Sequence, residues 1–315
     1  TSCDAFHQHP HQHPPHHPRE AQTMTRSSPI RLTSLGGGNM AQALLAGLLR
    51  SPAPVSELVV IEPVAATRAV IETSIGAQAL SAGVALHCFS AVEEAIHLSP
   101  SDWLLLAVKP QQARDALTAV SPSAKAWLHA PALLSIAAGL PMSGLAGWVG
   151  HHRLVRGMPN TPALVGQGIS GAFADLSLPA SARDQAHRLL QAVGPVLWVD
   201  HETLLDAVTA LSGSGPAYVF RFIEGLTSAG VALGLSAEQS QQLAKATVSG
   251  AMALLQASPE GPASLREKVT SKGGTTEAAL KALEQGGFVP LLEAALKAAA
   301  DRAAALGDER RREAQ

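Results

Sequence analysis

Short apolar runs alternate with helical stretches from Ile30 to about Asp200, and this alternation restricts the fold more than any other feature. The runs IRLTSLG, ELVVIEP, DWLLLAVKP and ALLSIAAG are typical of strands, and MAQALLAGLLRS, AATRAVIETSIG and QQARDALTAV are typical of helices. Continuously apolar strands separated by helices indicate a parallel sheet covered on both faces. The pattern predicts a doubly wound α/β fold, which HRLVRGMPNTPALVGQGISGAFA and GPVLWVD extend with further strands.

The strand signal disappears after His201, where helical patterns rich in Ala and Gly follow one another. Ser236 and Gln239 have the spacing of a capping box at a helix start, and Ser264 and Glu267 repeat it. Frequent small side chains let helices approach one another closely. We therefore expect an all-helical C-terminal dimerisation domain that packs against a second copy of itself.

Glycine and proline mark the expected interruptions of these helices. Gly307 is expected to end the last helix. Gly213, Gly215 and Pro216 interrupt the first long pattern, because proline breaks the helical ladder and glycine weakens it. The segment LSGSGPAY either lets the backbone approach a ligand closely or forms a tight helix crossing between two copies, and the sequence leaves both interpretations open.

The composition and the secondary-structure pattern divide the chain into four parts. These are a His/Pro-rich tail (1–23), the α/β domain (24–200), the helical domain (201–310) and a disordered C-terminal tail (311–315). The segment HQHPHQHPPHHP has side chains that bind metals, but its low complexity favours a disordered extension. Met24 is the expected native start.

Composition excludes several classes of partner. The chain has 315 residues, is 46% hydrophobic and carries a net charge of −2. No basic stripe indicates binding to nucleic acid or to an anionic membrane. No apolar run reaches the roughly 18–20 residues of a membrane span. Only Cys3 and Cys88 are present, which fits a reducing cytoplasm. No His, Asp or Cys arrangement indicates a metal centre.

The stretch LTSLGGGNMAQALLAGLL combines a strand, a glycine turn and a helix. Gly36, Gly38 and Ala41 fit the G-x-G-x-x-[GA] pattern, in which the turn lets a pyrophosphate approach the backbone at the helix N-terminus. Glu62 ends the next strand and is suited to a ribose 2′-hydroxyl, which favours NADH. Arg68 follows it and is suited to a 2′-phosphate, so the preference for NADH or NADPH stays open. The pattern predicts a Rossmann-type dinucleotide site.

Two further strand ends belong to the same expected edge, because ligands of such sheets lie beyond the carboxyl ends of the strands. The segment AVKPQQ brings Val108, Lys109 and Pro110 to one strand end, and SIAAGL brings residues 136–139 to another. Lys109 alone fits an ordinary surface lysine equally well.

The stretch VTSKGGTTEAAL (269–280) is unusually polar for the helical half. A glycine pair that opens a helix leaves unpaired N–H groups, and the helix dipole adds positive charge there. Such a turn binds an anion without an arginine. An ordinary helix cap is the alternative, since Ser and Thr are common there.

With these segments in place, the chain resembles pyrroline-5-carboxylate reductase. The resemblance runs in family order through nearly all of residues 30–310, in the segments GGGNMA, AVKPQ, SIAAG, RGMPNTPALVGQG, DAVTALSGSGPAY and VTSKGGTTEAA. It implies reduction of the cyclic imine 1-pyrroline-5-carboxylate to proline with NADPH or NADH, the last step of proline biosynthesis. It also implies a homodimer interlocked through the helical half, often assembled into a decamer.

The resemblance assigns roles to individual residues. It implies that the threonine hydroxyl of Thr276 bonds the imine nitrogen as the catalytic contact, and that the MPNTP turn brings Asn160 and Thr161 near the nicotinamide and substrate. The carboxylate cradle corresponds to Ser271, Gly273, Gly274, Thr275 and Thr276. Together with the glycine motif, the expected cofactor contacts are Leu35, Gly36, Gly37, Gly38, Asn39, Met40, Ala41, Glu62, Ser90, Ala107, Val108, Lys109, Pro110, Ala137, Ala138 and Gly139.

Three positions depart from the family pattern, and two other functions compete. Lys272 stands where proline is frequent, Ser90 stands where asparagine is frequent, and Glu62 is unlike the small polar residues of a strict NADPH enzyme. A hydroxyacid dehydrogenase with Lys245 as proton carrier is one alternative. A cofactor-binding scaffold without turnover is the other, for which Lys272 is the only indication.

Overall fold

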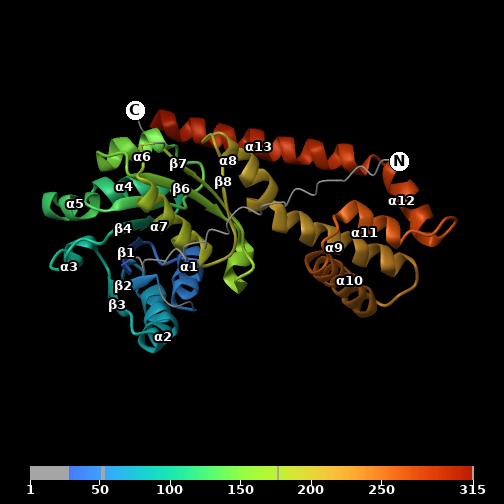
Figure 1. Ribbon diagram of the computed structural model, residues 1–315, viewed down its shortest axis with the longest axis horizontal. Helices are drawn as coiled ribbons and strands as arrows, with labels where there is room; N and C mark the ends of the chain where they lie inside the picture. Colours follow the sequence, from blue (N-terminus) through green and yellow to red (C-terminus); the bar gives the residue numbers. More distant parts are fainter. Residues whose placement is uncertain (1–27, 51–53, 176, 314–315) are drawn as a thin grey trace, which may run out of the picture.

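The computed structural model describes residues 28–50, 54–175 and 177–313. The His/Pro-rich tail (1–23) and Met24 lie outside the described residues. Eight strands form one sheet (Figure 1). The strands are β1 (Ile30–Leu35), β2 (Val55–Ile61), β3 (Ala85–Phe89), β4 (Trp103–Leu106), β5 (Ala132–Ser135), β6 (Leu154–Pro159), β7 (Ser170–Ala174) and β8 (Val196–Trp198).

The sheet has the order β3-β2-β1-β4-β5-β6-β7-β8. All neighbouring strands are parallel except β6 and β7, which are antiparallel. The first six strands follow the order of a dinucleotide-binding sheet, with the reversal of winding between β1 and β4. The prediction of a doubly wound sheet extended by additional strands is confirmed.

Helices cover both faces of the sheet and then form a separate group. The helices beside the sheet are α1 (Asn39–Arg50), α2 (Ala65–Ala82), α3 (Val92–Ala95), η1 (Pro110–Gln112), α4 (Ala113–Thr118), α5 (Pro122–His129), α6 (Met142–Val149), η2 (Thr161–Val165) and α7 (Ala180–Gln191). The later helices are α8 (Leu204–Val208), the π-helical turn η3 (Thr209–Gly213), α9 (Gly215–Ala232), α10 (Ala237–Ala257), α11 (Pro262–Lys268), α12 (Thr275–Gln285) and α13 (Phe288–Glu313).

Two hydrophobic clusters lie on opposite faces of the sheet. Trp103 and Leu105 of β4 belong to the cluster covered by α1, α2 and α7, whereas Leu104 and Leu106 belong to the cluster covered by α4, α5 and α6. Alternate side chains of one strand point to opposite faces, so a strand with apolar residues throughout is buried on both. This burial explains why β4 is apolar throughout.

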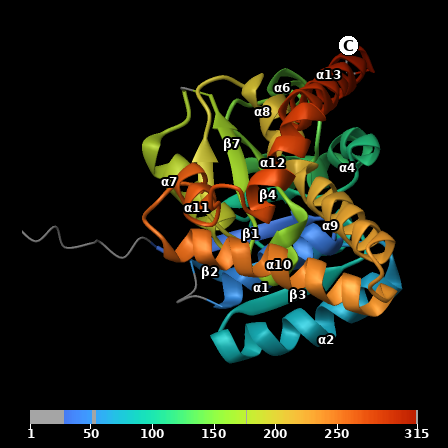
Figure 2. The ribbon, with the colours of Figure 1, turned by 90° about the vertical axis from the view of Figure 1, so that its right-hand side faces the viewer.

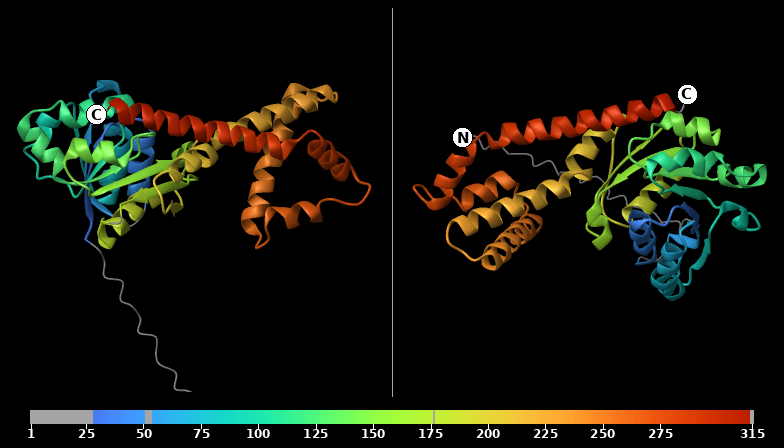
Figure 3. Two further views of the ribbon diagram at one scale, coloured as in Figure 1. Left: turned by 90° about the horizontal axis from the view of Figure 1, so that it is seen from above. Right: turned by 180° about the vertical axis from the view of Figure 1, so that it is seen from behind.

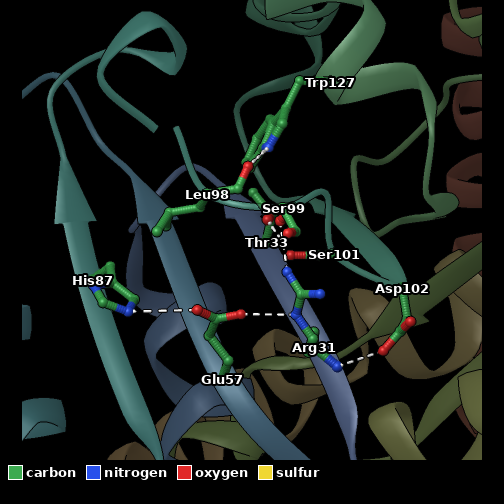
Figure 4. Close-up of polar contacts among 9 residues, drawn as sticks. All are labelled: Arg31, Thr33, Glu57, His87, Leu98, Ser99, Ser101, Asp102 and Trp127. Carbon is green, nitrogen blue, oxygen red and sulfur yellow. Dashed lines mark hydrogen bonds and ion pairs between the residues drawn. The ribbon is translucent and has the colours of Figure 1, made fainter. Parts of the chain in front are cut away.

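Polar contacts connect the amino-terminal halves of the strands, away from the ligand edge (Figure 4). The guanidinium of Arg31 contacts Glu57 at 2.8 Å and the Ser99 carbonyl at 2.6 Å. Its backbone N–H donates to Asp102 at 2.8 Å, and His87 lies 3.5 Å from Glu57. These contacts join β1, β2 and β3 to the segment before β4, so they stabilise the end of the sheet that is remote from the site.

The helical half lies to one side of the sheet (Figures 1 and 3). Helices α9 to α12 form a group of their own, and α9 and α10 lie side by side in front of the sheet in Figure 2. Helix α13 has 26 residues and is therefore about 39 Å long. It returns from α12 to the sheet, so the C-terminal end of the helix lies beside the first half of the chain (Figure 1).

The helical half exposes large apolar side chains. Helix α9 has 18 residues and none is buried, and α11 and α12 have none either. Phe220 is 63% exposed and Leu254 54% exposed. Contiguous apolar surface of this kind marks an interface. None of the helices in residues 28–50, 54–175 and 177–313 combines the length and hydropathy that a bilayer-spanning segment requires.

The helix ends agree with expectation at the start of α10 and differ from it in two places. The capping box of Ser236 and Gln239 is present at the start of α10, as predicted. The prediction of a second capping box at Ser264 was wrong, because α11 begins at Pro262 after Gly261. Gly307 lies inside α13, which continues to Glu313, so residues 311–313 are helical and not part of a tail. A glycine tolerated in a long helix costs only about 1 kcal/mol, which packing of α13 offsets.

Replacement of Ser236 tests the capping box. Ser236→Ala removes the hydroxyl that accepts the Gln239 N–H at 3.1 Å and should lower the free energy of unfolding by about 1 kcal/mol. Urea denaturation followed by circular dichroism measures the change. Ser228→Ala, in the exposed middle of α9, is the control and should change it by less than about 0.5 kcal/mol. Equal effects of the two variants would contradict the assignment of the cap.

Candidate active site

Three loops meet at the carboxyl ends of the central strands. The Gly36 N–H donates to the Ile61 carbonyl at 2.9 Å, which joins the glycine loop to the end of β2. The Ala107 N–H donates to the Leu35 carbonyl at 2.9 Å, and the Ile136 N–H donates to the Leu106 carbonyl at 3.1 Å. The ends of β1, β4 and β5 therefore form one continuous edge, as the sequence predicted.

The glycine loop is shaped for a ligand with a close backbone contact. Gly36 has φ 95°, and a Cβ there would lie 2.9 Å from the Ala107 carbonyl oxygen, so only glycine fits. A Cβ on Gly38 would meet nothing within 4 Å, which leaves open space in front of the first turn of α1. Ala41 is buried against the sheet. Open backbone at a helix N-terminus fits the pyrophosphate of a dinucleotide.

Glu62 follows β2, and its side chain is held by the glycine loop. Its carboxylate accepts the Gly37 N–H at 2.8 Å and the Val64 N–H at 2.9 Å, and only 8% of the residue is exposed. Arg68 donates to the carbonyls of Glu62 and Pro63, at 2.7 and 2.9 Å. The acid and the arginine therefore lie at the same strand end, where the ribose of an adenosine group binds in such sheets.

The remaining predicted cofactor residues differ in their surroundings. Ser90 donates its hydroxyl to Glu94 at 2.5 Å, and this bond lowers the pKa of the Glu94 carboxyl. Lys109 is exposed and is the residue just before η1. In the next loop Ala137 is buried and Ala138 is exposed. Among these residues, Lys109 and Ala138 are thus open to a ligand.

Helix α13 ends against the loop after β5. Gly139 has φ 72°, and a Cβ there would lie 3.3 Å from Arg310 Nε and 3.7 Å from Leu306 Cβ. The C-terminal helix therefore supports the same loop that contributes Ala137 and Ala138 to the edge. The sequence did not indicate this contact.

Asn160 follows β6 and is buried, with 8% of its surface exposed. Its Oδ1 accepts the Ile169 N–H at 3.0 Å, and its Nδ2 donates to the Ser212 carbonyl at 3.2 Å. Thr161 begins η2 beside it. The amide thus joins three segments of backbone at the carboxyl end of β6, and its predicted place near the nicotinamide and substrate stays a prediction.

The polar loop of the helical half connects α11 to α12. Gly273 has φ 75°, a conformation that favours glycine, and Gly274 precedes the first residue of α12 with no side chain capping that helix. Ser271, Lys272 and Thr275 are exposed, and Thr276 is half-buried. The first N–H groups of α12 therefore lie ahead of its hydrogen-bond ladder and lack a side-chain cap.

One carboxylate already occupies part of this loop. The Gly273 N–H donates to Glu277 at 2.5 Å, and Lys281 lies 3.1 Å from the same carboxyl. The Gly273 bond, followed by Lys281, lowers the pKa of Glu277. The sequence analysis did not single out Glu277, although an acid at this place in the first turn is a recognisable signal. The loop therefore binds a carboxylate in the structure itself.

The two sets of predicted residues are far apart within one chain. The loop between α11 and α12 lies at the end of the helical half away from the sheet (Figures 1 and 3). Helix α13 spans the separation and is about 39 Å long. The structure therefore brings together the cofactor residues and Asn160, whereas Ser271 to Thr276 are not beside them.

Sequence reasoning also missed a contact that joins β6 and the start of α6 to the segment before α8. Arg156 of β6 lies 2.6 Å from Glu202, and the same Glu202 oxygen accepts the Met142 N–H at 2.7 Å. The pair fixes the start of α6 and the loop before it. No sequence spacing indicates it, because the three residues come from separate elements.

Both halves match known families. Residues 202–306 match the family described as pyrroline-5-carboxylate reductase dimerisation. Residues 31–139 match the family described as NADP oxidoreductase, coenzyme F420-dependent. The match to the dimerisation family begins just before α8, where the helical half follows the last strand, and residues 140–201 with β6, β7 and β8 lie between the two matches.

Relatives cover nearly the whole chain. A pyrroline-5-carboxylate reductase from Pseudomonas aeruginosa is 41% identical over 280 residues, which are 89% of this chain and 97% of the relative. One from Synechocystis is 38% identical over 280 residues, which are 88% of this chain and 98% of the relative.

Solved structures agree with this likeness. A pyrroline-5-carboxylate reductase from Coxiella burnetii has a TM-score of 0.78 at 32% identity and covers 89% of this chain and 99% of its own. A Plasmodium falciparum pyrroline carboxylate reductase with NADP bound has a TM-score of 0.70 at 30% identity, over 88% and 98%. The edge of the sheet, the polar loop and these relatives together show that the chain belongs to the pyrroline-5-carboxylate reductase family.

Proposed function

We propose that this chain reduces the C=N bond of 1-pyrroline-5-carboxylate to give L-proline, with NADPH or NADH as the hydride donor. The reaction is the last step of proline biosynthesis. The observation that carries the proposal is the pairing, in one chain, of a dinucleotide edge with a glycine turn before α12 whose Gly273 N–H already donates to a carboxylate, that of the chain's own Glu277. Membership of the family supports the same activity.

The cofactor residues have separable tasks. Leu35 to Ala41 bind the pyrophosphate through backbone N–H groups and the start of α1. Ala107 to Pro110 and Ala137 to Gly139 hold the nicotinamide half of the cofactor at the carboxyl ends of β4 and β5. When bound, the cofactor supplies the hydride, and the chain supplies orientation and exclusion of water.

The polar loop binds the substrate at two points. The N–H groups of the glycine turn and of the start of α12, with Ser271, hold the carboxylate, because no side chain caps α12 and the helix dipole favours an anion. The hydroxyl of Thr276 bonds the imine nitrogen and fixes the face of the ring that accepts the hydride. Glu277 releases the Gly273 N–H when the substrate carboxylate binds, since both need the same donor.

The separation of the two sets of residues is resolved by a second copy of the chain. We propose that the exposed apolar surface of α9 to α12 is covered in a homodimer, and that this brings the polar loop of one copy to the cofactor edge of the other. Assembly of such dimers into a decamer is part of the proposal. A cytoplasmic location fits the two cysteines of the chain.

An oxidation assay tests the proposed function directly. The purified chain is given 1-pyrroline-5-carboxylate with NADPH and, in parallel, with NADH, and loss of the near-ultraviolet absorbance of the reduced cofactor is followed. Turnover with either cofactor is expected. A chain that binds nucleotide and turns over hydroxy acids instead would be a dehydrogenase. A chain that binds nucleotide without any turnover would be a scaffold.

Removal of the Thr276 hydroxyl tests its role. Thr276→Ala should lower kcat for the imine by roughly 10- to 100-fold, because a hydrogen bond to a charged group is lost in the transition state. Cofactor binding, measured by fluorescence titration, should change by less than about twofold. Thr270→Ala is the matched control, because the Thr270 hydroxyl donates back to the Arg266 carbonyl at 2.6 Å. An equal loss in both variants would remove Thr276 from the site.

Exchange of Glu62 tests cofactor preference. Glu62→Ser should shift the ratio of kcat/KM values from NADH towards NADPH by roughly tenfold or more, because a buried carboxylate repels a 2′-phosphate. Both cofactors should bind more weakly, since the Gly37 N–H loses its acceptor. Glu72→Ser makes the same charge change on the exposed face of α2 and should leave the ratio unchanged. An unaltered ratio in Glu62→Ser would mean that Glu62 does not read the ribose.

A further inference from the structure

The helix that leaves the sheet is interrupted by a π-helical turn. Helix α8 ends at Val208, η3 covers Thr209–Gly213, and α9 begins at Gly215. The Ser214 N–H donates to the Thr209 carbonyl at 2.8 Å, five residues back, so the helix is widened at this point. Single π-helical turns frequently lie at functional sites.

Pro216 explains why the helix is interrupted here. Proline has no N–H, so it cannot supply the helical hydrogen bond to the carbonyl four residues earlier, which is that of Ser212. A buried carbonyl without a donor is unfavourable. Asn160 Nδ2 donates to this carbonyl at 3.2 Å and supplies the missing bond from another segment.

The other end of the Asn160 amide is engaged as well. Oδ1 accepts the Ile169 N–H at 3.0 Å, just before β7. One buried side chain therefore joins the end of β6, the start of β7 and the π-helical turn. An asparagine amide can do this because it carries a donor and an acceptor on a short, stiff side chain.

The turn packs on the sheet with little room to move. A Cβ on Gly213 would lie 2.8 Å from Met158 Cε, and a Cβ on Gly171 would lie 2.5 Å from Val208 Cγ1. Helix α13 packs against η3 and α8 on its return. The outgoing and returning helices of the helical half thus meet at this one place.

We propose that Asn160 is a positioning residue, which fixes the direction of α9 by replacing the hydrogen bond that Pro216 removes. The role rests on the proposed function, because the helices whose direction it fixes carry the polar loop to a cofactor edge. Asn160 acts through the backbone of Ser212 and Ile169, which differs from the direct contact with nicotinamide or substrate that the sequence suggested.

The reaction is sensitive to this direction. Hydride transfer requires the reacting atoms at about 3–3.5 Å, and a misplacement of about 1 Å can cost 10²-fold in rate. A small change in angle at η3 moves the far end of α9 by more than that, because an 18-residue helix is about 27 Å long. Loss of the Asn160 bond therefore reduces kcat without removing a cofactor contact.

A double-mutant cycle between Asn160 and Pro216 tests the proposal. Asn160→Ala should lower kcat by roughly 10- to 100-fold and leave the Kd for the cofactor within about twofold. Pro216→Ala restores an N–H to the Ser212 carbonyl. The double variant should therefore lose less than the product of the two single effects. Pro290→Ala is the matched control, because Pro290 lies in the first turn of α13, and it should not reduce the loss in Asn160→Ala.

Two results would overturn the role of Asn160. One is a double variant whose loss in kcat equals the product of the losses in the two single variants. The other is a rise in cofactor Kd by the same factor as the fall in kcat, which would indicate direct contact with the cofactor. If Asn160→Ala does not fold, the cycle is run with Asn160→Asp, which keeps the acceptor for Ile169 and loses the donor for Ser212.

Hydrogen exchange separates this proposal from the proposed function. If the unmodified chain shows no turnover, the proposed function fails, and the positioning role is still measured at the backbone. Asn160→Ala should then raise exchange at Ile169 and Ser214, and the added Pro216→Ala should restore protection at Ser214 alone. Unchanged exchange at both amides would contradict the role.

Discussion

The arrangement of the whole molecule depends on apolar surface that one chain cannot bury. Helix α9 has no buried residue in this structure, and side chains such as Phe220 and Leu254 are largely exposed. At about 25 cal/mol per Å² of apolar surface, covering such faces is a strong driving force for association. The exposed apolar faces therefore favour association of the helical half with a second copy, and in the proposed homodimer the position of the polar loop follows from that association.

The chemistry of the site relies on backbone more than on charged side chains. The glycine loop offers N–H groups and open space at Gly38, and the glycine turn before α12 offers the Gly273 N–H, which already donates to Glu277. Such donors bind anions without the desolvation of a buried arginine. Glu62 is the exception, since its buried carboxylate accepts the Gly37 and Val64 N–H groups and so shapes the glycine loop.

Local pattern predicted most of the first half, because its central strands are buried on both faces and the turn after β1 is marked by glycine. The glycine loop, the two neighbouring strand ends and the cap at Ser236 follow from sequence. The links of Asn160 to Ser212 and of Glu202 to Arg156 do not, because they join segments that only the fold brings together. The distance between the polar loop and the edge of the sheet could not be predicted from local pattern either. It depends on the direction of α9, which we propose is fixed at the turn η3.

Complementation between two impaired variants tests the composite site most directly. Gly38→Glu places an acid where the pyrophosphate approaches and meets no atom within 4 Å, so the chain should still fold. Chains with Gly38→Glu and chains with Thr276→Ala are co-expressed with different tags, and the heterodimer is purified by both. If the loop of one copy serves the edge of the other, the heterodimer contains one intact site, and its activity should rise well above that of either parent. A heterodimer no more active than the Thr276→Ala parent would show that each chain completes its own site.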